Sequence, residues 1–334
     1  MEIKQMKNIV SAFILATLLL SGCGGGAAKK TTTKESHETS VIVPAFNGDS
    51  AYSFVDAQVA FGPRVPGSEA HRACALWLED KLRSYGADVI VQNMELTAYT
   101  GERLDARNII AQFQPQNKKR VMLCAHWDSR PWADADPDPA NHRKPILGAN
   151  DGGSGVGVLI EVARQLSMLP TEIGIDIILF DAEDYGTHAS EEATTENSWA
   201  LGSQYWSRLP HKQHYNARYG ILLDIVGAPN SKFYREGISE EYAASIIDKV
   251  WNRAASLGYG DTFINQKGGY VTDDHLYVNH FLHIPCIDII NHDPDSENGF
   301  GPYWHTLKDN MEWISSETLA KVGQTVLAVI YNEK

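Results

Sequence analysis

Short apolar runs alternate along this chain with longer segments in which apolar residues recur at helical spacing. The apolar runs have the length and composition of buried strands and cover residues 108–113, 120–126, 175–181, 221–226 and 284–290. The segments with helical spacing cover residues 75–85, 156–166, 199–209, 240–257 and 316–331. This alternation predicts an α/β fold in which a central, twisted, mostly parallel mixed sheet is flanked by helices on both faces.

The N-terminal segment has a pattern of its own. Lys4 and Lys7 precede an apolar stretch at residues 9–20, and the sequence Leu20-Ser21-Gly22-Cys23 follows at once. This segment resembles the signal peptide and lipobox of bacterial lipoproteins, in which the cysteine is acylated and becomes the mature N-terminus. An ordinary cleaved signal peptide is the alternative, and it also implies export but gives Cys23 no function.

The stretch after Cys23 is rich in glycine, lysine, threonine and serine up to residue 40, a composition typical of a flexible linker. We therefore predict a lipoprotein signal peptide at residues 1–22, a lipidated cysteine and tether at residues 23–45, and a single catalytic domain at residues 46–334. The lipid at Cys23 is expected to anchor the protein to a membrane on its periplasmic side, and to the outer membrane in preference to the inner one.

Composition and charge narrow the functional classes. The chain has 42 acidic and 29 basic residues, for a net charge of −13, so the phosphate backbone of a nucleic acid would repel it. Beyond the N-terminus, no apolar stretch reaches the roughly 18 residues that a transmembrane helix requires. Cys74, Cys124 and Cys286 are the cysteines of the body. Their odd number leaves at least one free thiol, and the sequence does not decide their pairing.

Polar side chains that can bind metals follow the predicted strands. In sheets of this kind the carboxyl ends of the strands form the ligand crevice. The candidates are His126, Asp151, the pair Glu183 and Asp184, Asp224, the run Asp273-Asp274-His275, and the run Trp304-His305-Thr306. Zinc accepts both carboxylate and imidazole ligands. Adjacent acids such as Glu183 and Asp184 can point in different directions, one toward a metal and the other toward a substrate.

Each candidate also has a structural interpretation. A lone histidine or aspartate after a strand is commonly a cap or a solvated loop residue, and Asp273 opens a helical pattern that it can cap. Trp304 can be a core aromatic. Asp134, Asp136 and Asp138 lie in a loop with a calcium-like spacing of acids, but the glycine and terminal glutamate of an EF-hand are missing. We interpret that loop as solvated, stiffened by prolines, and near the mouth of a pocket.

Taken in order, the motifs resemble those of the zinc aminopeptidase-like hydrolases, and within them those of the glutaminyl cyclases. The matching motifs are His-aromatic-Asp-Ser at 126–129, Gly-Ala-x-Asp at 148–151, Phe-Asp-x-Glu-acidic at 180–184, Leu-Leu-Asp-x-x-Gly-Ala-Pro-Asn at 222–230, Asp-Asp-His at 273–275 and Trp-His-Thr at 304–306. The first three motifs are shared with the aminopeptidases, whereas the motifs at 222–230 and 304–306 are more particular to the cyclases. The resemblance covers roughly residues 50–330.

The resemblance implies one zinc per chain, held by Asp151, Asp184 and His305. It also implies that Glu183 is the acid/base and that Asp224 and Asp273 form a supporting carboxylate network. Trp304 and Phe300 match aromatics that line the substrate pocket. The animal enzymes carry glutamate where this chain has Asp184, and they have a pocket tryptophan that residues 185–189 do not supply. Trp199 is our candidate to replace it.

The expected reaction is the zinc-dependent acyl transfer that converts the N-terminal glutamine of peptides or proteins to pyroglutamate with release of ammonia. The alternative is a two-zinc aminopeptidase, because His126 and Asp224 match the positions that bind the second metal in that family and Asp151 would then bridge the ions. A non-catalytic lipoprotein that only binds ligands is disfavoured, because the chain keeps every matched ligand and the acid/base. The sequence does not determine the oligomeric state.

Overall fold

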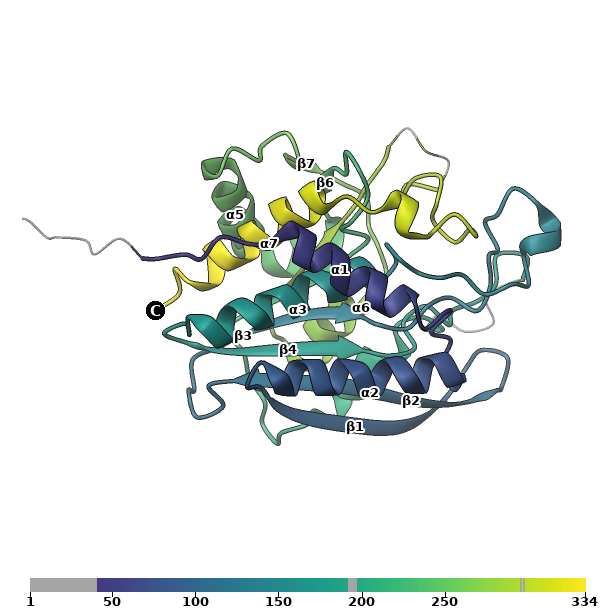
Figure 1. The fold of residues 1–334 in the computed structure, drawn as a ribbon, viewed down its shortest axis with the longest axis horizontal. Helices are drawn as coiled ribbons and strands as arrows, with labels where there is room; N and C mark the ends of the chain where they lie inside the picture. The colour runs from purple at the N-terminus through teal and green to yellow at the C-terminus, as the bar shows by residue number, and fades with distance from the viewer. Residues whose placement is uncertain (1–40, 192–196, 295, 297) are drawn as a thin grey trace, which may run out of the picture. The chain divides into compact units, whose positions relative to one another are not determined.

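The computed structural model describes residues 41–334 except 192–196, 295 and 297 (Figure 1). The predicted signal peptide, Cys23 and the tether up to residue 40 lie outside the described residues. Residues 41–334 form one compact unit. The helices are α1 (Gly48–Val59), α2 (Glu69–Ser84), α3 (Gly153–Met168), α4 (Leu201–Arg208), α5 (Gly237–Ser256), α6 (Asp274–Tyr277) and α7 (Ser316–Ile330). Short 3-10 helices η1 (Pro139–Asn141) and η3 (Met311–Trp313) and a π-helix η2 (Val278–Leu282) complete the helical elements.

The main sheet has six strands in the order β1-β2-β4-β3-β5-β8. Its strands are β1 (Asp88–Thr97), β2 (Arg103–Phe113), β3 (Arg120–His126), β4 (Gly174–Phe180), β5 (Gly220–Asp224) and β8 (Cys286–Ile290). β4, β3, β5 and β8 run parallel to one another, while β2 pairs antiparallel with both β1 and β4. The predicted mixed, mostly parallel sheet is thereby confirmed. A separate pair of parallel strands is formed by β6 (Phe233–Arg235) and β7 (Phe263–Lys267).

The sequence analysis missed the antiparallel edge of the sheet. The apolar run at residues 108–113 is only the buried end of β2, and its partner β1 was not predicted. Most residues of β1 are exposed or only partly buried, so this strand lacks the continuous apolar run that marks β3 and β4. Strands buried on both faces are apolar throughout, whereas an edge strand need not be.

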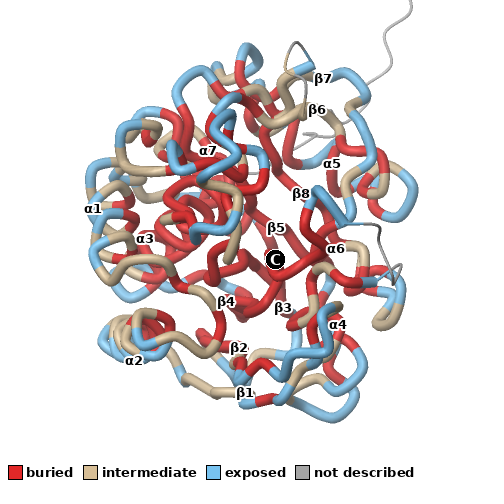
Figure 2. The backbone as a smooth tube through the Cα atoms, turned by 90° about the vertical axis from the view of Figure 1, so that its right-hand side faces the viewer, coloured by how far each residue is buried: buried red, intermediate tan, exposed pale blue. Residues whose placement is uncertain are grey.

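Helices cover both faces of the sheet. On one face α1, α2, α3 and α7 pack over β2, β3 and β5, and Figure 1 shows α1, α3 and α7 next to one another. On the other face α4 and α6 pack against β2, β5 and β8 around a smaller apolar cluster that includes Trp206. Figure 2 shows the central strands buried between these layers. The layers leave the carboxyl ends of the parallel strands free to carry loops.

Local sequence explains where the helices that border this edge begin and end. Ser68 caps α2 by accepting a hydrogen bond from the His71 N–H, and Gly86 follows the helix with a φ of +82°, a conformation that glycine adopts without strain. In α3, a Cβ on Gly155 would lie 2.1 Å from the Leu223 carbonyl oxygen. Glycine at this position therefore lets α3 approach β5 closely and places the turn before α3 at the end of that strand.

The compact unit begins a few residues before the predicted domain boundary. The carbonyl oxygens of Pro44 and Ala45 accept hydrogen bonds from Gln324 and Gln165, so the last residues of the predicted tether are attached to α7 and α3. Within the part of the chain that the structure describes, Cys74, Cys124 and Cys286 are buried free thiols. The same residues contain no helix long and apolar enough to cross a membrane.

Candidate active site

Asp151, Asp184 and His305 meet at the carboxyl end of the parallel strands. The His305 Nε2 atom lies 3.2 Å from Asp184 Oδ1 and 3.6 Å from Asp151 Oδ2. All these side chains are buried, and their nearest ligand atoms lie within 4.8 Å of one another. The structure thus brings together the residues predicted to hold zinc.

The donor set fits a zinc ion. Two carboxylates and one imidazole, with a fourth position left open, are the ligands of a catalytic zinc site. Among the described residues, Asp184 Oδ2 is buried and has no hydrogen-bond partner. Because buried polar atoms are almost always partnered, this oxygen is available to a metal. The aspartate found here in place of glutamate therefore still reaches the set.

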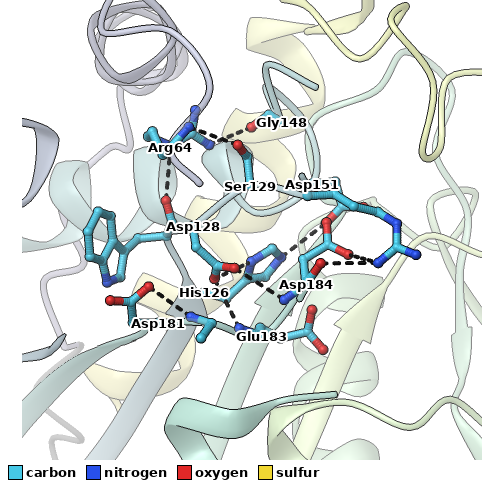
Figure 3. A network of polar contacts seen from close by, with 12 residues as sticks. Arg64, His126, Asp128, Ser129, Gly148, Asp151, Asp181, Glu183 and Asp184 are labelled. Atoms are coloured by element: carbon cyan, nitrogen blue, oxygen red, sulfur yellow. Dashed lines mark hydrogen bonds and ion pairs between the residues drawn. The ribbon is translucent and has the colours of Figure 1, made fainter. Parts of the chain in front are cut away.

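Two further buried carboxylates hold the main chain of the metal-binding segments. Asp128 accepts hydrogen bonds from the N–H groups of Glu183 and Asp184, at 3.1 and 3.2 Å (Figure 3). Asp309 does the same for Asp151 and the residue before it, at 3.1 and 2.7 Å. The sequence analysis gave neither residue a function, although Asp128 lies within the first matched motif.

Glu183 lines the pocket beside the metal-binding set and is 8% exposed. Burial, followed by the charge of nearby Asp273, raises the pKa of Glu183 well above its usual value. A carboxyl group with a raised pKa can both accept and return a proton near neutral pH. This environment suits the acid/base function predicted for Glu183.

Asp224 and Asp273 line the same pocket as Glu183. Burial, followed by the charge of Asp151, raises the pKa of Asp224 to about 8, and burial also raises the pKa of Asp273. Asp273 is in addition the N-cap of α6, because it accepts a hydrogen bond from the Asp274 N–H. Asp273 therefore caps α6, as its structural interpretation predicts, and it also lines the pocket.

His126 gives the site a second group of potential ligands. Its Nε2 atom lies 3.1 Å from Asp151 Oδ1 and 3.2 Å from Asp224 Oδ1. These are the residues expected to bind the second ion of an aminopeptidase, and their ligand atoms also lie within 4.8 Å of one another. The arrangement offers donors for one ion, or for two ions that share Asp151.

A third buried group of potential metal ligands comprises Asp273, His275 and Asp288. The His275 Nε2 atom lies 3.0 Å from Glu236 Oε2, while His275 Nδ1 is 4.0 Å from Asp288 Oδ2. In the described part of the chain, both Asp288 carboxylate oxygens lack a hydrogen-bond partner. This group extends the predicted carboxylate network away from the pocket.

The pocket has a cavity volume of about 230 Å³, and part of its wall is apolar. The predicted aromatics Trp304 and Phe300 lie in this wall with their ring centroids 5.1 Å apart. The Trp304 ring also stacks on the imidazole of His305 at 3.5 Å. Other lining residues that the sequence analysis did not name are Ile225, Tyr270, Val271, Thr272 and Ile290.

Trp199 forms another part of the wall. Its ring is stacked on His305 with a centroid separation of 6.0 Å. A Cβ on Gly186 would lie 2.0 Å from the Trp199 ring, so the glycine makes room for this tryptophan. A ring from residue 199 thus lies against the segment in which the animal enzymes' pocket tryptophan is missing.

The acidic loop after β3 is solvated only in part, because Asp138 is exposed whereas the two acids before it are buried. Asp134 and Asp136 are only 6% and 8% exposed. Asp136 Oδ2 accepts a hydrogen bond from the Leu307 N–H, and the Ala135 N–H donates to the His305 carbonyl oxygen. Spacing alone did not reveal these partners, because they lie far away in the sequence. The loop packs against the segment that carries a metal ligand.

Comparisons with known proteins agree with this geometry. The model of "Peptidase family M28" matches residues 108–330. Aminopeptidase YwaD of Bacillus subtilis (strain 168) is 30% identical over 248 residues, which cover 71% of this chain but only 46% of that protein. Glutaminyl-peptide cyclotransferase of Drosophila melanogaster is 24% identical over 288 residues, covering 78% of this chain and 75% of that protein.

Solved structures give a more specific likeness. The crystal structure of a Bacteroides thetaiotaomicron glutaminyl cyclase bound to N-acetylhistamine has a TM-score of 0.86 and 57% identity, and covers 88% of this chain and 100% of that chain. A Zn-dependent exopeptidase from Parabacteroides distasonis ATCC 8503 has a TM-score of 0.87 and 57% identity, and covers 87% of this chain and 100% of that chain. Cyclases and exopeptidases thus share this fold.

Proposed function

This chain belongs to peptidase family M28, and we propose that it is a zinc-dependent glutaminyl-peptide cyclotransferase. This acyltransferase would convert the N-terminal glutamine of peptides and proteins to pyroglutamate and release ammonia. The likeness to glutaminyl cyclases at 57% identity supports this reaction. The observation that carries the proposal is the pocket, which is lined by Glu183, by the metal-binding set and by an aromatic wall.

The pocket suits a single side chain. Its cavity volume of about 230 Å³ is below the roughly 300–1,000 Å³ of sites that enclose drug-sized ligands. The aromatic wall of Trp304 and Phe300 can hold the glutamine side chain bent, so that the α-amine approaches the carbon of its own side-chain amide. Holding reacting atoms near contact supplies much of the advantage of an intramolecular closure.

The cofactor is zinc, and Asp151, Asp184 and His305 would hold one ion. When bound, zinc supplies a Lewis acid for the oxygen of the side-chain amide. The carboxylates of Asp224 and Asp273, which line the pocket, orient the substrate amine. The substrate's own amine is the nucleophile, so the reaction requires no activated water.

Glu183 moves the proton. Its carboxylate accepts a proton from the α-amine as the nitrogen bonds to the side-chain carbonyl carbon. It then gives this proton to the amide nitrogen, whose bond to that carbon breaks, so that ammonia leaves and a five-membered lactam remains. The raised pKa of Glu183 favours keeping the proton between the two steps.

An aminopeptidase is the second candidate, and the proximity of His126 to Asp151 and Asp224 favours it. In that reaction two ions would activate a water molecule that cuts the first peptide bond. The substrates would then be peptides with many different N-terminal residues. The two candidates therefore differ in their products.

Mass spectrometry of the products separates the two candidates. We expect Gln-initiated peptides to lose the mass of one ammonia and to keep their first peptide bond. Asn-initiated peptides are the matched control, because their amine would have to close a strained four-membered ring, and they should stay unchanged. Stepwise shortening of Leu- or Ala-initiated peptides would overturn the cyclase and identify an aminopeptidase.

We further propose that Cys23 carries a lipid that anchors the protein on the periplasmic side of a membrane, the outer membrane in preference to the inner one. The lipobox sequence and the polar stretch after it support this location. A Cys23→Ala variant should either be soluble or keep its signal peptide uncleaved. A Ser21→Ala control should be processed and remain in the membrane fraction. Unchanged membrane association of Cys23→Ala protein that has lost its signal peptide would refute the anchor.

A further inference from the structure

We propose that Arg130 and Asp134 form a positioning pair that determines which atoms of Asp184 and His305 face the metal. Arg130 also connects these two residues to Trp199 in the pocket wall. This inference rests on the metal site of the proposed function. Neither residue received a function from the sequence, where the Asp134 loop was expected to be solvated. Both side chains are 1% exposed.

Arg130 uses its whole guanidinium group. This group presents five N–H donors in a rigid fork. Its Nε and Nη2 atoms donate to the two carboxylate oxygens of Asp134, at 2.8 and 2.5 Å, and Nη2 also donates to the Thr187 carbonyl oxygen at 3.2 Å. Its Nη1 atom donates to both the carbonyl oxygen and Oδ1 of Asp184, at 3.1 and 3.3 Å. A lysine has only three donors and no fork, so it cannot reproduce this pattern.

The pair distinguishes the two oxygens of Asp184. Oδ1 accepts the hydrogen bond from Arg130, whereas Oδ2 is buried and lacks a partner among the described residues. Oδ1, which also lies 3.2 Å from His305 Nε2, shares its lone pairs with the arginine, whereas Oδ2 has no competing donor. This arrangement predicts that Asp184 binds zinc through Oδ2.

The pair also orients His305. Asp134 Oδ1 lies 3.5 Å from His305 Nδ1, while His305 Nε2 faces Asp151 and Asp184. A histidine that binds a metal commonly directs its other ring nitrogen to a carboxylate, which fixes its tautomer and its orientation. Asp134 thus leaves Nε2 of His305 as the ligand atom.

Arg130 connects this metal site to the substrate pocket. Its Cζ atom lies 4.6 Å from the ring centroid of Trp199, a residue of the pocket wall, and 5.3 Å from that of Trp132. A planar guanidinium stacks well on aromatic rings. The same cation therefore supports one metal ligand and the side chain that would contact the substrate.

Arg120 provides a matched control for a purely structural effect. It is also a buried arginine that pairs with an aspartate, Asp176, but at the opposite end of β3. We expect Arg130→Lys to weaken zinc binding by about 10- to 100-fold in competition with a chromogenic chelator, the range typical of partners that orient ligands. Arg120→Lys should lower the melting temperature without changing zinc affinity. Equal zinc affinities of wild type and Arg130→Lys would overturn the proposal.

Two further measurements keep the proposal testable if Arg130→Lys does not fold. Asp134→Asn preserves the size of the side chain and should weaken zinc binding over the same range. A crystal structure of the zinc-loaded wild-type protein should show coordination through Asp184 Oδ2 and His305 Nε2. Zinc bound at this set through Asp184 Oδ1 or His305 Nδ1 would overturn the pair but leave the proposed function in place, whereas zinc absent from the set would contradict both.

Discussion

The two ends of β3 and β4 hold buried polar clusters of opposite character. At the amino end, Arg120 forms a bidentate pair with Asp176, and Asp176 also accepts hydrogen bonds from Gln112 and Tyr215. The other donors of Arg120 reach carbonyl oxygens, including that of Phe113. This cluster is buried and fully hydrogen-bonded, which favours rigidity.

The cluster at the carboxyl end is incompletely partnered. Within the described residues, its buried atoms without a hydrogen-bond partner include His126 Nδ1, Asp184 Oδ2, Asp273 Oδ2 and both carboxylate oxygens of Asp274 and Asp288. Burial raises the pKa of several of these acids, Asp184 and Asp288 among them. The same strands therefore carry a fully paired arginine–aspartate cluster at one end and, at the other, a buried acidic cluster that has donors left over for a cation.

The largest expected effect concerns the proton carrier of the carboxyl-end cluster. Glu183→Gln should reduce cyclisation by about 10²- to 10⁴-fold and leave zinc bound, because it removes the acid/base and none of the predicted ligands. Glu161→Gln changes a buried glutamate on α3, away from the pocket, and should retain activity. Activity assays and zinc analysis of both variants check this expectation, and near-normal turnover of Glu183→Gln would exclude it as the carrier.

A substitution in the amino-end cluster should change the stability of the protein and not its activity. Arg120→Met leaves Asp176 buried without its cation, and should lower the free energy of unfolding by about 3–5 kcal/mol. Lys321→Met removes the exposed ion pair with Glu317 and should change it by less than about 1 kcal/mol. Urea denaturation measures both variants. A small effect of Arg120→Met would mean that this cluster does not stabilise the fold.

The aromatic wall should affect catalysis and not metal binding. Trp304→Ala removes the ring that lines the pocket, and should lower the cyclisation rate by about 100-fold with zinc retained. Trp313→Ala serves as the control, because Trp313 packs against Tyr303 outside the pocket. If both variants cyclised Gln-initiated peptides equally well, the wall would have no part in bending the substrate.

The last expected effect is the pH dependence of stability in the metal-free protein. The pKa of Asp224 is about 8 and that of Asp309 about 7, while an unfolded aspartate has a pKa of about 3.9. Between these values the folded state holds more protons, so the stability falls as the pH rises from about 4 to 8. The slope is of the order of 1 kcal/mol per pH unit for each group.

Urea midpoints of the metal-free protein at pH 5 and pH 8 test this expectation. Asp224→Asn cannot titrate at this position and should show a smaller slope than wild type. A stability that is constant or rises over this interval would contradict the raised pKa values. That result would also mean that the carboxyl-end acids do not differ from the paired charges of the amino-end cluster in the way that their raised pKa values imply.

The sequence predicted much of the site because its signals are local. The order of polar residues after the apolar strands placed Asp151, Glu183 and Asp224 at one edge of the sheet, where the structure finds them. It did not reveal Asp309 as the partner of the Asp151 N–H, because the two residues are 158 positions apart. The burial of Asp134 and Asp136 was missed because the loop packs against the segment around His305, which is distant in sequence.

The sequence by itself determined the α/β fold class and the residue types that gather at the strand ends, because apolar periodicity and strand order act over short distances along the chain. The tertiary structure alone decided which oxygen of Asp184 is left for a metal, which nitrogen of His305 faces Asp151, and which ring lies beside Gly186. Those choices depend on hydrogen bonds and ring contacts between segments that are distant in sequence, and only the packed fold sets their geometry.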